Sequence, residues 1–149
     1  MQNDRNIMWE AWGRTNALYT KWCYCFGQNP YRLLVLYALN AREPVTQMRI
    51  ADCTGLSKQT VSTVMRSLKS SGYVSLREGE TDRREKNVYL TEKGKRYAEE
   101  VLSSLYALER RVFDIVGEER VKQLSDDISL FNIVFEKEME KQKDEQNKY

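Results

Sequence analysis

The sequence predicts a mostly α-helical protein with one small β-hairpin. Apolar residues recur at helical spacing through long segments, and helix-capping residues and glycines divide these segments from one another. Two short runs with strand character, "YVSLRE" (73–78) and "KNVYLT" (86–91), flank the polar loop "GETDRRE". At 149 residues, the chain is long enough for one domain with a core of its own.

The first helix is expected over residues 7–26, followed by a stop at Gly27. Its apolar stripe contains Met8, Ala11, Trp12, Leu18, Tyr19, Trp22, Cys25 and Phe26. Asn29 is the expected N-cap of the second helix, with Pro30 at its first position. Because "YRLLVLYALN" is apolar on nearly every side, this helix is predicted to be central and buried.

Two short helices follow, joined by a tight turn. Thr46 is the expected N-cap of "TQMRIADCTG", and Gly55 follows the end of that helix. Ser57 is the expected N-cap of "KQTVSTVMRSLKSSG", which closes at Gly72. Two short helices with a glycine in the turn between them predict a helix-turn-helix unit.

After the hairpin, Thr91 can cap a long helix over 92–116, and Gly117 separates it from a last helix that runs towards Met139. The polar tail, residues 140–149, is expected to be frayed. A helix-turn-helix followed directly by a hairpin is a winged helix. We therefore expect a single domain over 1–149, in which the winged helix-turn-helix (about 30–91) lies between dimerisation helices (about 5–27 and 92–140).

Composition limits the classes of function. The chain has no histidine and no glycine-rich phosphate loop, which disfavours an enzyme and a metal site, and no cofactor is expected. No apolar run approaches the roughly 20 residues of a membrane span, and no signal peptide is visible, so a cytoplasmic location is expected. The net charge is only +2, but the segment from Arg42 to Arg96 carries twelve basic and seven acidic residues. This asymmetry favours a polyanionic partner.

The second helix of the helix-turn-helix has a polar face suited to double-stranded DNA. At about 100° per residue, Val61, Val64, Met65 and Leu68 form its core face. Residues 57–71 contain no acid, whereas an ordinary surface helix usually pairs acids with bases. The predicted major-groove contacts are Lys58, Gln59, Ser62, Thr63 and Arg66, because these residue types match base edges. The predicted phosphate contacts are Ser57 and Lys69.

These residues resemble the MarR family of winged-helix transcription regulators. The wing signature of that family is Asp-x-Arg, five residues, then Leu-Thr, a charged pair and Gly, and this chain has Asp82, Arg84, Leu90, Thr91, Glu92, Lys93 and Gly94 in register. The resemblance extends through "RIADCTGLSKQTVSTVMRSLKSSGYV" (49–74). It implies that Arg84 enters the minor groove, that Asp82 holds Arg84, and that Arg83 contacts phosphate. One departure is Leu76, which stands where relatives often carry a basic residue.

The terminal helices carry more apolar surface than a small monomer buries. The last helix has two apolar faces, one with Leu124, Ile128, Phe131 and Phe135 and one with Leu130, Ile133 and Val134. We therefore expect a homodimer, which would bind a pseudo-palindromic operator with half-sites roughly 10 bp apart. The resemblance further implies a repressor released by a small aromatic or amphipathic effector. The candidate crevice residues are Trp12, Tyr19, Trp22 and Tyr31.

The three cysteines leave one alternative open. Cys23 and Cys25 diverge by about 200° on a helix and form no pair, and Cys25 and Cys53 are expected to be buried apolar groups. A cysteine-based redox regulator and a winged-helix protein-interaction module without specific DNA binding remain as alternatives.

Overall fold

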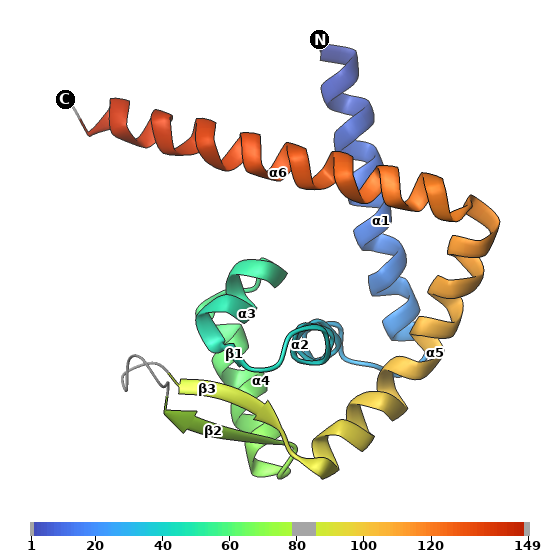
Figure 1. The fold of residues 1–149 in the computed structure, drawn as a ribbon, viewed down its shortest axis with the longest axis vertical. Coiled ribbons are helices and arrows are strands. Elements are labelled where there is room, and N and C mark those ends of the chain that lie inside the picture. The colour runs from blue at the N-terminus through green and yellow to red at the C-terminus, as the bar shows by residue number, and fades with distance from the viewer. Residues whose placement is uncertain (1, 79–85, 148–149) are drawn as a thin grey trace. The chain divides into compact units, whose positions relative to one another are not determined.

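The computed structural model of the chain describes residues 2–78 and 86–147. These residues form six α-helices and three strands (Figure 1), and their bounds follow in chain order. The elements are α1 (Gln2–Cys25), α2 (Pro30–Ala41), β1 (Val45–Thr46), α3 (Gln47–Thr54), α4 (Lys58–Ser70), β2 (Val74–Glu78), β3 (Lys86–Leu90), α5 (Glu92–Val116) and α6 (Glu118–Gln146). The predicted fold class, mostly α with a β-hairpin wing, is confirmed. The chain divides into two compact units, Met1–Ser104 and Leu105–Tyr149.

The helix starts follow local capping chemistry, as the sequence predicts. Each expected cap side chain accepts a hydrogen bond from the backbone N–H three residues later. The pairs are Asn29 with Arg32 (3.0 Å), Thr46 with Arg49 (3.2 Å), Ser57 with Thr60 (3.1 Å) and Thr91 with Gly94 (3.0 Å). The cap positions predicted from sequence are therefore confirmed.

The core of the first unit is built around α2. This helix contacts α1, α3, α4 and β3, and it lies at the centre of the unit in Figure 1. Its buried residues are Leu33, Val35, Leu36 and Leu39. The predicted central position of this helix is confirmed, but burial on nearly every side is not, since Tyr31 and Leu34 are exposed.

The sheet has a third strand that the sequence does not predict. Its order is β1-β3-β2, with both pairings antiparallel. Val45 lies opposite Val88 in the β1 pairing, and Val74 lies opposite Leu90 in the β2 pairing. A strand of two residues is too short to show alternation, so only the pairing with β3 identifies it.

Two further expectations are wrong. The last helix does not end near Met139 but continues to Gln146, since glutamate, lysine and glutamine are good helix formers and the exposed pair Glu138–Lys141 supports the helix surface. Among the cysteines, Cys23 is the buried one, whereas Cys25 and Cys53 are exposed. The thiol of Cys23 faces the core, and burial raises its pKa.

Candidate DNA-binding interface

The polar face of α4 is exposed, as predicted. Val61, Met65 and Leu68 are buried beneath it. The side chains expected in the major groove, together with the phosphate candidate Lys69, all lie on exposed positions: Lys58, Gln59, Ser62, Thr63, Arg66 and Lys69. The structure therefore brings these side chains together on one surface. Their contacts with DNA remain a prediction.

Two hydroxyls of this region are engaged within the helix. The Ser57 hydroxyl caps α4 and lies 2.8 Å from the Thr60 hydroxyl. The Thr63 hydroxyl donates to the carbonyl oxygen of Gln59 at 3.0 Å. If Ser57 contacts a phosphate, the same hydroxyl that caps α4 would also bind the DNA. The phosphate would then be held at the N-terminus of α4.

The C-terminus of α4 is closed by a Schellman motif. The N–H of Gly72 donates to the carbonyl of Lys69, and the N–H of Tyr73 donates to the carbonyl of Leu68, both at 2.9 Å. Gly72 has a backbone φ of +72°, which residues other than glycine rarely adopt. The motif directs the chain from the end of α4 straight into β2.

The wing is formed by β2 and β3. Glu78 lies opposite Lys86 at the last described pair, and residues 79–85 connect these two. The predicted wing contacts Asp82, Arg83 and Arg84 belong to this connection and lie outside the described residues. On the described strands, the Arg77 guanidinium lies 4.6 Å from the centre of the Tyr89 ring, and Leu76 pairs with Val88.

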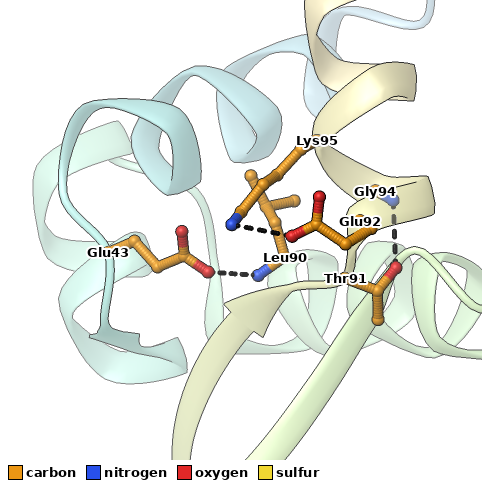
Figure 2. Close-up of polar contacts among 6 residues, drawn as sticks. All are labelled: Glu43, Leu90, Thr91, Glu92, Gly94 and Lys95. Atoms are coloured by element: carbon orange, nitrogen blue, oxygen red, sulfur yellow. Dashed lines mark hydrogen bonds and ion pairs between the residues drawn. The ribbon is translucent and has the colours of Figure 1, made fainter.

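The wing is anchored at its base by contacts that the sequence does not reveal (Figure 2). Glu43 Oε1 accepts a hydrogen bond of 2.6 Å from the backbone N–H of Leu90. Glu43 comes two residues before β1, so its carboxylate accepts from β3 on the edge where the pairing of β3 with β1 has ended. Lys95 pairs with Glu92 at 3.1 Å, and its pKa is raised by this bond and by the charges of Glu92 and Glu43. No local pattern connects residue 43 with residue 90.

The fold matches a solved structure over nearly its whole length. NMB1585, a MarR family regulator from Neisseria meningitidis, is 31% identical to this chain, with a TM-score of 0.78. The match covers 91% of this chain and 96% of that protein. The chain belongs to the MarR family.

Two other comparisons agree with this assignment. The family model described as "MarR family" matches residues 28–85, which span α2 to the wing. YwoH, an HTH-type transcriptional regulator of Bacillus subtilis strain 168, is 36% identical over 76 residues, but the match spans only 55% of YwoH. The fold is shared by CouR of Rhodococcus jostii RHA1, solved with p-coumaroyl-CoA, at 23% identity, coverage of 82% and 86%, and a TM-score of 0.65.

As a MarR protein, the chain has the fold of a DNA-binding transcriptional regulator rather than that of an enzyme family. In the described part of the chain, no helix is long and apolar enough to cross a membrane. Over the same residues, no group of three or more Cys, Asp or Glu side chains is arranged to hold a metal ion.

Of the four candidate crevice residues of this MarR protein, Tyr31 lines a hollow where α1 meets α2, and the effector crevice itself remains a prediction. Trp22 is buried and stacks on Phe26 with 4.9 Å between ring centres, whereas Trp12, Tyr19 and Tyr31 are partly exposed. A hollow of about 520 Å³ lies where α1 meets α2. It is lined by Thr20, Tyr24, Gly27, Gln28, Asn29, Pro30 and Tyr31. Of the four predicted residues, only Tyr31 belongs to it.

Proposed function

We propose that this MarR-family protein is a homodimeric repressor that binds a pseudo-palindromic operator and is released by a small-molecule effector. The observation that carries the proposal is the exposed polar face of α4, where residues 57–71 contain no acid. A surface of hydroxyls, an amide and basic groups matches both the base edges and the phosphates of DNA.

The dimer is supported by the apolar surface of α6. This helix has no buried residue, although many of its side chains are apolar. The exposed ones are Leu124, Ile128, Leu130, Ile133, Val134, Phe135 and Met139. Exposed apolar side chains on two faces of one helix are typical of an obligate subunit contact. In this proposal, α1, α5 and α6 form the dimer, and two copies of α4 enter successive major grooves.

The effector is supported by the hollow between α1 and α2. Its lining combines the aromatic rings of Tyr24 and Tyr31 with the amides of Gln28 and Asn29. Small-molecule sites commonly combine such an apolar wall with a few polar groups. We therefore propose a small aromatic compound as the effector.

Selection of bound sequences from a random duplex library, at about 150 mM salt, tests the proposal, because that salt suppresses much of the phosphate-only binding. We expect a two-fold palindrome. A reporter gene placed behind that operator should be repressed, and the effector should restore its expression. Recovery of no motif would contradict specific DNA binding and favour a winged-helix module for protein partners.

Replacing Gln59 with Ala should weaken operator binding by about 1–3 kcal/mol, because a bidentate contact with one base would be lost. The preference at that one base position should relax, and the rest of the sequence logo should remain. Gln142→Ala, near the end of α6, is the matched control. An unchanged logo for the Gln59 variant would show that this side chain does not read a base.

Replacing Arg84 with Ala should reduce the slope of log affinity against log salt by about one unit for each protomer, because one cationic contact with DNA is lost. The loss of affinity should be largest for operators with A·T-rich flanks, since the narrow minor groove of such DNA attracts arginine. Lys143→Ala, which removes a positive charge from α6, should leave the slope unchanged. Identical salt titrations for the Arg84 variant and the parent would exclude Arg84 from the interface.

A further inference from the structure

We propose that Arg32 is a positioning residue for DNA recognition, which fixes the C-terminal half of α4 against α2 and α5 and so sets the distance between the two recognition helices of a dimer. The inference rests on the homodimer of the proposed function. It concerns how the distance between the two copies of α4 matches the distance between the two half-sites of the operator. It does not concern which bases α4 contacts.

The Arg32 guanidinium joins three helices. Its Nη2 donates to the Ser67 hydroxyl of α4 at 2.8 Å, and its Nη1 donates to the Tyr97 hydroxyl of α5 at 3.3 Å. The acceptors are 35 and 65 residues away along the chain, and both bonds are partly buried. A planar guanidinium can hold two acceptors in a fixed geometry, whereas a lysine ammonium is a single flexible point.

The position of Arg32 within α2 is not explained by the stability of that helix. It lies in the first turn, where the helix dipole disfavours a positive charge. The backbone N–H of Arg32 is already capped by Asn29 at 3.0 Å. The positive charge of Arg32 is therefore unfavourable for α2 itself. The hydrogen bonds to Ser67 and Tyr97 compensate for this cost.

A second set of contacts binds the same end of α4 to α5. The Tyr73 and Tyr97 rings stack with 4.1 Å between their centres and 4° between their planes. Lys93 Nζ donates to the carbonyl of Ser71, the C-cap of α4, at 2.9 Å. We call Arg32, Ser67, Tyr73 and Tyr97 the α4 clamp. Tyr97 is its centre, since it accepts from Arg32 and stacks on Tyr73.

The clamp connects DNA reading with the dimer. From Tyr97, α5 continues as one helix to Val116 and ends in exposed apolar residues that the proposed dimer would cover: Val112, Phe113, Ile115 and Val116. The clamp therefore joins the C-terminal half of α4 to the first turns of α5, the helix whose far end the proposed dimer would cover. A loosened clamp should let the two copies of α4 vary in separation.

Operators that differ only in half-site spacing test the inference. The selected palindrome is prepared with its centre shortened or lengthened by one and two base pairs, and binding is measured for the parent and for Arg32→Ala, Arg32→Lys and Arg42→Ala. Arg42 follows the other end of α2 and serves as the charge-matched control. We expect the parent and the control to prefer one spacing sharply. Arg32→Ala should bind the operator of preferred spacing about tenfold more weakly than the parent and the other operators almost as well as the parent. Its affinity should therefore vary less with half-site spacing. Arg32→Lys should lie between the two.

A purely structural role would lower the active fraction equally on every spacing and leave the shape of the profile unchanged. That result, or a sharp profile for Arg32→Ala, would overturn the inference while leaving the proposed function intact. A parent protein without any spacing preference would instead overturn the proposed dimer. If Arg32→Ala does not fold, Tyr97→Phe replaces it, since it keeps the ring stack and removes only the hydroxyl that accepts from Arg32, and it should flatten the profile in part.

Discussion

Replacing Gly94 with Ala should lower the free energy of unfolding by about 3 kcal/mol, because no space exists for the added methyl group. A Cβ at this position would overlap the carbonyl oxygen of Tyr73 and lie 2.8 Å from the carbonyl carbon of Tyr73. The backbone cannot easily shift to remove this overlap. Thr91 donates from its N–H to this same carbonyl at 3.0 Å and from its hydroxyl to the carbonyl of Gly72 at 2.7 Å, which holds the start of α5 against the end of α4.

Urea unfolding at fixed protein concentration measures this effect, with Gly13→Ala as the matched control. Gly13 lies within α1 and has open space around its Cα. Its replacement should be stabilising by up to about 1 kcal/mol, because alanine has the higher helix propensity. Equal effects of the two substitutions would show that the close approach at Gly94 does not matter for stability.

Replacing Ile133 with Glu should convert the dimer into monomers and weaken operator binding by about a hundredfold or more, because two linked half-site contacts become one. Ile133 is 65% exposed on α6, and a carboxylate there would be desolvated if a second copy covered it. Light scattering after size-exclusion chromatography measures the mass, and a binding titration measures the affinity.

The control for Ile133→Glu is Gln142→Glu, which adds the same charge to the polar end of α6. This variant should remain dimeric and should bind the operator like the parent. If Ile133→Glu stays dimeric as well, the face of α6 that contains Ile133 is not the subunit contact. If it becomes monomeric and still binds with full affinity, DNA recognition does not require the dimer.

The capped helix starts and the exposed polar face of α4 could be predicted from the sequence because they depend on short-range chemistry. An N-cap such as Asn29 or Ser57 acts on a backbone N–H three residues away, so its effect is visible in a short window of sequence. The burial of Val61 and the exposure of Arg66 follow from helical periodicity in the same way. The wing motif ending at Gly94 is also local, although its sequence does not explain why a glycine is required.

Tertiary structure alone decided the features that depend on residues far apart in the chain. Arg32 meets Ser67 and Tyr97, and Glu43 meets the N–H of Leu90, through distances of 35 to 65 residues that no periodicity encodes. The same holds for Cys23, which is buried where Cys25 was expected, because the orientation of the end of α1 is set by its packing on α2. Local chemistry therefore determined where the elements begin and which side chains α4 exposes. Packing between distant elements determined how α4 and the wing are held in place.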